Sequence, residues 1–523
     1  MNLKNITRTI TCACFLLAGT TSCSDWLDVA MSDKVMENTL FDTNKGYLTA
    51  LNGVYLEMND LYVDNLTAGN LDVMAQYYNV TKNYSHSKAL YANYEFKDPT
   101  FESYRNSVWS GAYRLIANTN VLLERCDADD AAIEADFYPI VKGEALALRA
   151  LLHFDMLRLF GPVYSEATAS EKCIPYHKSS SKDIQPLLPA SKVLQNVIAD
   201  LEQAAKLLKG ADPIITEGVR NAAQNDNGLD NNNLNYRQLR LNYYAVQALL
   251  ARAYSWGGDK VKAYEIAKNE IIDKITTEKL AVFPWTTEEQ VHAEGKADRI
   301  FSSEVFFALY KTNLSNLYTN LFSSALDANT GRLAFVGSNY NDSKIPYFYD
   351  DENDWRREMW EVTGANDSES EGEGVGEGEG EGEGEGEGEE GSTLYFVKFK
   401  EFAYDAQTNG TELYRYMMPL IRLSEVYLIA AEGAPTSEEA YQYINTLRLH
   451  RNCRDVVDNG DLQGAITAEF AREVIGEGQL FYYYKRHAME SIVSGTAINQ
   501  SYKMELGNYV LPLPTSETDK RVM

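Results

Sequence analysis

The sequence predicts an all-α, mostly helical fold built from tetratricopeptide-like helix pairs with long irregular, aromatic-rich loops. Three observations lead to this prediction. Apolar residues recur at spacings of three and four, small residues stand where paired helices would face each other, and tyrosines gather between these stretches. The chain has 523 residues, enough for several domains, but helix pairs must stack to bury their apolar faces. We therefore expect a single helical domain over residues 46–523.

The first predicted helices lie between residues 100 and 210. One amphipathic helix contains Trp109 and ends near Cys126. A second and more apolar helix spans residues 140–160, and the Gly-Pro pair that follows stops it. A third helix over residues 193–208 would return against the second, after a proline-rich loop.

Two further helix pairs are predicted at residues 241–271 and 420–449. In the first pair, Gly257 and Gly258 make a tight turn between the two apolar stripes. In the second pair, alanines at facing positions include Ala430 and Ala440. Small residues at such positions let antiparallel helices approach closely, which is typical of tetratricopeptide units.

Aromatic residues concentrate in two irregular segments, residues 70–104 and 311–360. The chain has 35 tyrosines against 19 phenylalanines, an excess of rings that carry a polar edge. Long structureless loops in compact proteins are either functional or disordered, and segments so rich in rings are rarely disordered. The sequence therefore favours two binding loops.

Residues 368–391 form a Glu-Gly tract with eleven glutamates between positions 369 and 390. Such a tract buries almost nothing and repels itself, so we expect a disordered insert with poor affinity for calcium. It also accounts for much of the formal net charge of −28. A chain this acidic does not suit binding to nucleic acid or to an anionic membrane surface.

The N-terminus has the order of an export signal over residues 1–22. Lys4 and Arg8 precede a short apolar run over 10–19, small residues follow, and Cys23 comes next. This pattern is similar to a bacterial lipoprotein signal, so we expect a lipidated Cys23 and a tether over residues 23–45. The alternative is an ordinary secretory signal with an incidental cysteine. Both interpretations take the protein out of the cytoplasm.

No motif for catalysis, metal or cofactor emerges from the sequence. The chain lacks a P-loop, a zinc-protease motif and a hydrolase nucleophile elbow. His153 falls within an apolar helix, where a packed core histidine is expected. The three remaining cysteines are widely spaced, which favours buried thiols over a disulfide framework but leaves one bridge open; they are Cys126, Cys173 and Cys453.

Seven blocks, in order, resemble the SusD/RagB family of outer-membrane lipoproteins of Bacteroidetes. The blocks are Cys23–Val29, Trp109–Asn120, Gly143–Pro162, Arg240–Tyr254, Pro419–Arg448, Arg472–Arg486 and Asn508–Pro514. The resemblance spans nearly the whole chain from residue 23. There are departures from the family pattern: the Glu-Gly tract is foreign to it, the usual second proline after Gly161-Pro162 is missing, and Phe470 and Gln479 stand where arginine is frequent.

The resemblance implies a SusD-like, surface-exposed and non-catalytic lipoprotein that caps a SusC-like TonB-dependent transporter. It would capture a nutrient, most often a glycan, and pass it to the transporter. No cofactor is implied. Four charged residues on the family's helices are expected to form structural ion pairs rather than ligand contacts; they are Arg149, Glu425, Glu432 and Arg448.

In starch-binding members of the family, an arc of loop aromatics stacks on the sugar, and the corresponding loops here are residues 70–104 and 311–360. These loops do not align residue by residue, so the expected ligand residues are chosen by position. They are Asp72, Tyr77, Tyr78, Tyr94, Tyr347, Asp354, Trp355 and Arg356.

Three alternatives stay open at this point. The same complex could carry peptide or another nutrient, which the tyrosine excess does not distinguish from glycan. A helical surface glycoside hydrolase would need a pair of catalytic carboxylates, and the sequence singles out none. A scaffold that only bridges proteins would tolerate replacement of Tyr347 and Trp355.

Overall fold

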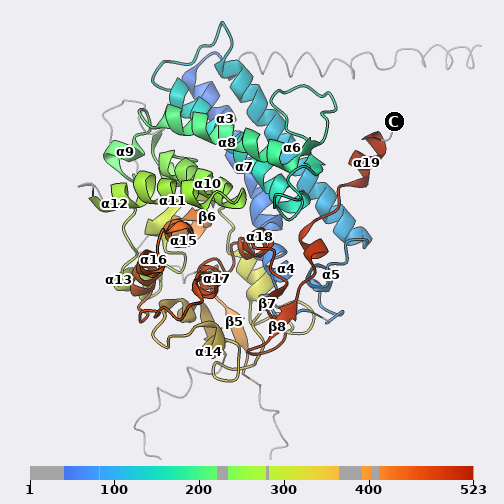
Figure 1. Ribbon diagram of the computed structural model, residues 1–523, viewed down its shortest axis with the longest axis vertical. Helices are drawn as coiled ribbons and strands as arrows, with labels where there is room; N and C mark the ends of the chain where they lie inside the picture. Colours follow the sequence, from blue (N-terminus) through green and yellow to red (C-terminus); the bar gives the residue numbers. More distant parts are fainter. Residues whose placement is uncertain are drawn as a thin grey trace, which may run out of the picture.

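The computed structural model describes residues 40–81, 83–220, 234–277, 282–363, 392–401 and 412–521, and it confirms the all-α prediction (Figure 1). The long helices are α3 (Asn44–Asn65), α6 (Pro99–Cys126), α7 (Tyr138–Phe160), α8 (Ala190–Leu208), α10 (Tyr243–Trp256), α15 (Leu423–Gly433), α16 (Ser437–Leu449) and α17 (Leu462–Glu473). Shorter ones are α4 (Leu71–Met74), α5 (Ala89–Ala92), α9 (Ile214–Glu217), α11 (Lys260–Ile266), α12 (Asp273–Thr277), α13 (Glu288–Val291), α14 (Ile345–Phe348), α18 (Leu480–Arg486) and α19 (Thr515–Arg521).

Helices α6, α7 and α8 end where the sequence predicts. Helix α7 is buried along most of its length, so it forms the centre of this group. It can approach α8 closely at Gly143, because a Cβ there would lie only 2.8 Å from the Cγ of Leu208. The predicted pairing of residues 140–160 with 193–208 is therefore confirmed.

The C-terminus of α7 receives an unusual cap from α18. The buried Lys485 ammonium donates to the carbonyl oxygens of Arg158, Leu159 and Gly161 at 2.7, 3.3 and 2.7 Å. These carbonyls lie at the negative end of the helix dipole and lack helical partners, so a cation there stabilises the helix end.

The other two predicted helix pairs are α10 with α11 and α15 with α16. The α10–α11 turn uses Gly258 at φ +83°, a left-handed conformation that favours glycine. Helix α11 continues as a π-helix over Ala267–Ile272. Gly433 at the end of α15 lies against α11, since a Cβ there would lie 2.4 Å from the carbonyl oxygen of Lys260. Both pairs are confirmed.

Within the described residues, the structure has four short antiparallel strand pairs that were not predicted. They are β1 (Lys172–Ile174) with β2 (Leu188–Pro189), β3 (Val305–Tyr310) with β6 (Met417–Arg422), β4 (Trp360–Val362) with β5 (Leu394–Phe396), and β7 (Ser491–Val493) with β8 (Ser501–Lys503). In the longest pair, β3 and β6 are buried almost throughout, so neither strand shows the alternation of apolar and polar residues that marks a strand in a sequence.

The two aromatic segments are irregular, as predicted, but most of their rings lie inside the protein. Residues 70–104 contain only short helices until α6 begins at Pro99. Residues 311–360 likewise contain only short helices until β4 begins at Trp360. Tyr77, Phe335 and Tyr349 are each about 1% exposed. The hydroxyl groups of Tyr77 and Tyr94 donate to backbone carbonyl oxygens, so an excess of tyrosine does not by itself mark a ligand surface.

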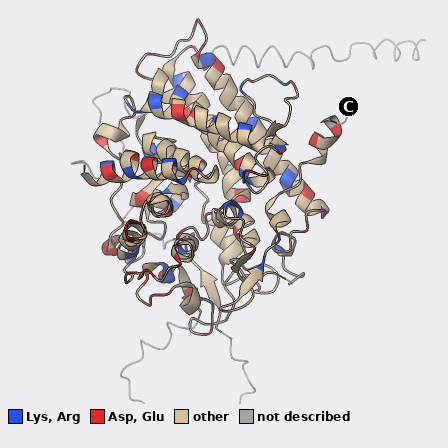
Figure 2. Cartoon of the chain, in the orientation of Figure 1, with Lys and Arg blue, Asp and Glu red and all other residues tan. Residues whose placement is uncertain are grey.

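Other expectations are settled where the structure describes the chain. His153 is fully buried in the core, and Cys126, Cys173 and Cys453 are buried free thiols. Figure 2 shows acidic and basic residues interspersed along the described helices. Among the described residues no helix is both long and apolar enough to cross a membrane. Cys23, the signal over residues 1–22 and the insert over 368–391 lie outside the described residues.

Candidate ligand-binding site

A cavity of about 650 Å³ opens between α14, α17 and the β7–β8 hairpin. These elements lie near one another in the lower half of Figure 1. The lining residues come from three stretches of the chain. They are Lys344, Tyr347 and Phe348; Asp461, Gln463, Gly464, Thr467, Ala468, Ala471, Arg472, Tyr484 and Met489; and Ser491, Ile492, Val493, Asn499, Gln500 and Ser501.

Helix α17 forms one wall because its two faces differ. Gly464, Thr467 and Ala471 recur at helical spacing and line the cavity. Glu469 and Glu473 lie on the opposite side and are 1% and 3% exposed. The helix thus presents mainly small residues to the cavity, together with Arg472 near its end, and directs Glu469 and Glu473 to the interior.

The interior face of α17 is held by a network of buried ion pairs. Glu473 pairs with Arg356 at 2.8 Å, Arg451 at 2.8 Å and Arg422 at 2.9 Å. Burial alone would raise the pKa of Glu473, but the three guanidinium groups hold it well below its usual value. Removing one member of such a network leaves buried charges without partners, so the network fixes the position of the helix.

Glu469 anchors the same face one turn earlier. It pairs with Arg356 at 3.0 Å, Arg448 at 2.5 Å and Arg472 at 2.6 Å. Burial opposes ionisation here too, and the three arginines lower the pKa of Glu469 to about 2. Arg472 also donates to the carbonyl oxygen of Phe348 at 2.7 Å, which ties α14 to α17 at the floor of the cavity.

The C-terminal end of α17 is capped by side chains from distant segments. Tyr77 donates to the carbonyl oxygen of Ala471 at 2.6 Å, and Arg422 donates to that of Glu473. Both carbonyls belong to the last turn, whose oxygens have no partner within the helix.

Asp72 fixes the turn that follows α17. Its carboxylate accepts from the backbone N–H groups of Gly476 at 2.6 Å and Gly478 at 3.0 Å. These glycines have φ of +86° and +73°, which side-chain-bearing residues rarely adopt. Burial raises the pKa of Asp72 to about 7, although the two N–H donors and nearby Lys398 act in the opposite direction.

The β7–β8 hairpin forms the opposite wall and is attached to the segment after α4. Lys344 donates to the carbonyl oxygens of Tyr77 at 3.1 Å and Ser494 at 3.0 Å. Gly495 lies so close to this segment that a Cβ would stand 2.2 Å from the carbonyl oxygen of Tyr78. The hairpin therefore has a fixed position relative to the core.

The chemistry of the cavity wall is mixed. Tyr347 is 58% exposed and Val493 is 41% exposed, so apolar surface is accessible at the rim. Gln463, Thr467 and Gln500 add neutral hydrogen-bonding groups to the lining. A ring beside neutral donors and acceptors suits a pyranose, whose C–H face stacks on the ring while its hydroxyls form hydrogen bonds.

The eight residues that the sequence suggested for ligand contact have different environments in the structure. Six are buried and do not line the cavity; they are Asp72, Tyr77, Tyr78, Tyr94, Asp354 and Arg356. Asp354 and Arg356 pair with each other at 2.7 Å, and Tyr94 donates to the carbonyl oxygen of Met74 at 2.6 Å. Tyr78 lies 3.5 Å from the carboxylate of Asp72.

Tyr347 alone among the eight lines the cavity. Trp355 is half-buried, lies outside this lining, and meets the His292 ring edge-on at 5.9 Å. Ligand contact therefore stays a proposal centred on Tyr347.

Sequence reasoning missed the wall from α17 and the β7–β8 hairpin. One signal was present, since residues 491–503 combine short apolar stretches with a Ser-, Gly- and Asn-containing turn, the pattern of a hairpin. The cavity face of α17 gives no comparable signal, because small residues such as Gly464, Thr467 and Ala471 do not by themselves indicate a binding surface in a sequence.

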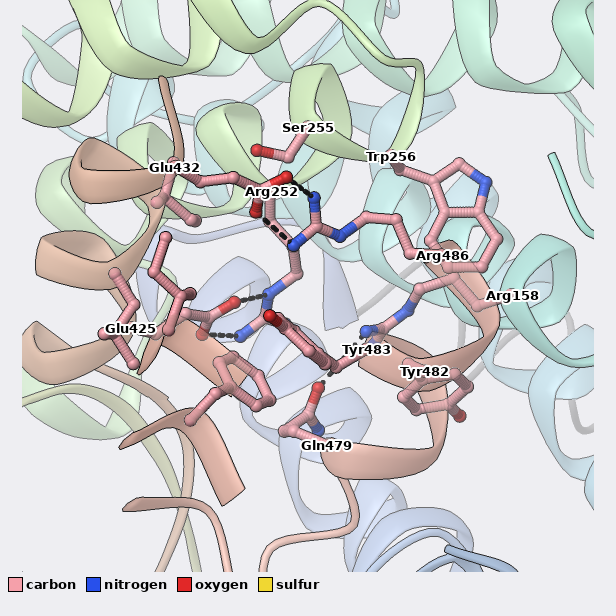
Figure 3. A pocket seen from close by; sticks show the side chains of 14 residues that line it. Arg158, Arg252, Ser255, Trp256, Glu425, Glu432, Gln479, Tyr482, Tyr483 and Arg486 are labelled. Atoms are coloured by element: carbon pink, nitrogen blue, oxygen red, sulfur yellow. Dashed lines mark hydrogen bonds and ion pairs between the residues drawn. The ribbon is translucent and has the colours of Figure 1, made fainter. Parts of the chain in front are cut away.

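Figure 3 shows two of the four charged residues that were expected to form structural ion pairs, Glu425 and Glu432. They line a small cavity of about 30 Å³. Arg252 pairs with Glu425 at 2.5 Å, and Arg486 with Glu432 at 2.6 Å. A cavity of this size holds about one water molecule. Outside the figure, Arg149 pairs with Asp200 at 2.7 Å. With the Arg448–Glu469 contact, all four expected structural ion pairs are confirmed.

A second open cavity of about 480 Å³ lies between α6, the loop over residues 175–185 and α19. Its lining includes Ser179, Ser180 and Ser181. The ring of Trp109 in this wall is only 5% exposed, in contrast with Tyr347 at the first cavity. The first cavity is therefore the stronger candidate for a stacking ligand.

Comparisons with known proteins place this geometry in context. A family model described as starch-binding associating with outer membrane matches residues 25–223, and the model of the SusD family matches residues 330–521. The search of curated proteins found no match to this chain.

Among solved structures, a SusD superfamily protein from Bacteroides thetaiotaomicron is 21% identical, with a TM-score of 0.65 over 91% of this chain and 98% of its own. A laminarin-binding SusD-like protein is 17% identical, with a TM-score of 0.59 over 91% and 98%. Surface glycan-binding protein A from Bacteroides thetaiotaomicron is 16% identical, with a TM-score of 0.60 over 92% and 98%. At these identities the likeness is one of fold.

Proposed function

Because the chain belongs to the SusD/RagB family, we propose that it is a non-catalytic, glycan-binding lipoprotein of the cell surface. In this proposal, Cys23 carries the lipid anchor in the outer membrane. The protein captures a glycan in the cavity between α17 and the β7–β8 hairpin and passes it to a SusC-like TonB-dependent transporter.

The observation that carries the proposal is the exposed ring of Tyr347 at the rim of a cavity of about 650 Å³ whose lining includes the neutral polar side chains of Gln463, Thr467 and Gln500. Binding sites for small ligands are concave, largely preformed, and combine apolar surface with a few oriented polar groups. The α17 wall meets the requirement for a preformed site, because Glu469, Glu473 and Tyr77 hold it from behind. The names of two structural neighbours, which refer to laminarin and to surface glycan, support the choice of ligand class.

Binding of the lipid-free protein, residues 24–523, to immobilised polysaccharides tests the proposed ligand class. A proteolytic digest runs beside the polysaccharides as the competing cargo. We expect at least one polysaccharide to bind and the digest not to bind. Binding of peptides alone would contradict the glycan proposal.

The variant Tyr347→Ala localises the binding. Loss of a stacked ring and its buried area should weaken the affinity about tenfold without a change in thermal stability. Tyr84→Ala is the matched control, because Tyr84 is 74% exposed but does not line the cavity. Equal effects of the two variants would contradict the assignment of the cavity.

The partnership is tested separately. Tagged full-length protein would be purified from outer membranes in mild detergent, and its partners identified by mass spectrometry. A TonB-dependent barrel in near-equal amount is the expected result. Recovery of the protein without a barrel would contradict the transport role while leaving ligand binding intact. If Cys23 carries the lipid anchor, the variant Cys23→Ala should be absent from the membrane fraction.

A further inference from the structure

Lys344 lines the candidate cavity and carries a buried ammonium group. The residue is 2% exposed and lies directly before α14. The ammonium has three N–H groups, and two of them donate hydrogen bonds to the carbonyl oxygens of Tyr77 and Ser494. The rings of Phe335 and Phe348 lie 4.9 and 5.7 Å from the nitrogen, close enough for cation–π contact.

No carboxylate in the described part of the chain forms an ion pair with Lys344. Its neighbours are dipoles and rings rather than charges, and burial lowers its pKa to about 7. Lys398 shows the usual arrangement of a buried lysine, since it pairs with Glu477 at 2.6 Å. Lys485 also lacks an acidic partner, but its three contacts are all carbonyls at the end of α7. Lys344 differs from both, because it lines an open cavity and the third N–H group of its ammonium remains available for a ligand.

The other titratable groups of the lining do not cancel this charge. Arg472 is balanced by Glu469 at 2.6 Å and Asp350 at 3.2 Å. The exposed Asp461 accepts from the backbone N–H of Gly464 at 2.9 Å and so caps the start of α17. Burial raises the pKa of Tyr484, which keeps this phenol neutral.

We propose that the cavity selects an acidic glycan, with the ammonium of Lys344 receiving the carboxylate or sulfate group of one sugar while Tyr347 stacks on a ring at the rim. This inference rests on the glycan-binding function proposed above and adds its ligand class. The anion supplies the counter-charge that the protein does not. A charge-assisted hydrogen bond at a buried position is also stronger than one between neutral groups.

The test compares neutral polysaccharides with their acidic counterparts on the lipid-free protein. The probes are laminarin and C6-oxidised laminarin, starch and C6-oxidised starch, polygalacturonate, alginate and a sulfated glucan. We expect at least one acidic polymer to bind at least about tenfold more tightly than any neutral one. Comparing the carboxylated polymers with the sulfated glucan shows which of the two anionic groups the cavity prefers.

Two variants separate the charge from the packing. Lys344→Met should remove the preference for acidic polymers, and Lys344→Arg should retain most of it. Thermal unfolding of both variants checks that they fold. Wild-type protein gives an independent readout, since affinity for an acidic polymer should fall as the pH rises through about 7, where Lys344 loses its proton. Affinity for a neutral polymer should stay flat over the same range.

The outcomes are distinct. Neutral polymers that bind as tightly as acidic ones would overturn this inference and leave the glycan function standing. An acidic preference that Lys344→Met retains would also overturn it. If no polysaccharide binds and a peptide digest does, the proposed function fails, and the inference fails with it.

Discussion

The hydroxyl group of Tyr77 donates a 2.6 Å hydrogen bond to the carbonyl oxygen of Ala471, across 394 positions of the sequence. Ala471 lines the candidate cavity, and Tyr77 stands behind it in the interior. An aromatic residue expected to touch ligand thus supports the wall that faces the ligand. Asp72 has a similar place, since it holds the turn directly after α17.

Tyr77→Phe should test this support. The substitution keeps the ring and leaves the carbonyl of Ala471 without a partner, so we expect a loss of about 1–3 kcal/mol in the free energy of unfolding. Ligand affinity should also fall, because the end of α17 is less firmly held. Urea unfolding and a binding assay measure the two effects. Tyr84→Phe, at an exposed tyrosine, should change neither, and an equal effect at both positions would argue against the role of Tyr77.

Glu469→Gln should destabilise the protein strongly at neutral pH. The variant leaves Arg356, Arg448 and Arg472 with one anion fewer in the interior, which costs about 3–5 kcal/mol. Urea unfolding at neutral pH measures the loss. Glu490→Gln, at an exposed position, is the control and should have no comparable effect.

The same variant predicts a pH dependence. The pKa of Glu469 falls from 4.5 to about 2 on folding, so its contribution is present above about pH 4.5 and is lost as the pH falls toward 2. The stability gap between wild type and Glu469→Gln should therefore narrow in acid. A gap independent of pH would show that the carboxylate does not act through its charge.

Lys344→Met should show a pH dependence in a more alkaline range. Burial lowers the pKa of Lys344 from 10.5 to about 7, so the folded protein binds fewer protons than the unfolded chain between these values. Wild type should gain stability relative to the variant as the pH rises from about 7 to about 10. Lys192→Met, at an exposed lysine of α8, should show no such trend. A flat difference for Lys344→Met would mean that its ammonium is not desolvated.

Gly495→Ala should displace the β7–β8 hairpin. The added Cβ would meet the carbonyl oxygen of Tyr78, so we expect a destabilisation of about 1–3 kcal/mol and weaker ligand binding. Gly507→Ala is the matched control, because a Cβ there meets nothing within 4 Å. Thermal unfolding and affinity measured for both variants test the prediction. A Gly495→Ala protein that binds ligand normally would show that the hairpin does not shape the site.

The sequence was sufficient to predict the helices that pack through small residues. The end of α6 at Cys126, the stop of α7 at Gly161 and the turn at Gly258 all follow from local signals. The buried strands β3 and β6 could not be predicted in this way, because residues buried on both faces of a strand show no alternation.

The candidate site was predicted only through Tyr347. The wall of α17 depends on contacts between segments far apart in the sequence, such as Arg356 with Glu473 and Tyr77 with Ala471. A segment rich in tyrosines indicates that some of its rings will be partly buried, but tertiary packing decides which tyrosine side chain faces solvent. In residues 70–104, Tyr84 is exposed while Tyr77, Tyr78 and Tyr94 are enclosed.

The central claim is that a sugar occupies the cavity between α17 and the β7–β8 hairpin. A crystal structure of the lipid-free protein with an oligosaccharide fragment of the tightest-binding polysaccharide tests it most directly. We expect a pyranose ring stacked on Tyr347, with its polar groups directed toward Gln463, Thr467 and Lys344. A sugar bound instead in the cavity beside α6 and α19, with the first cavity empty, would contradict the account.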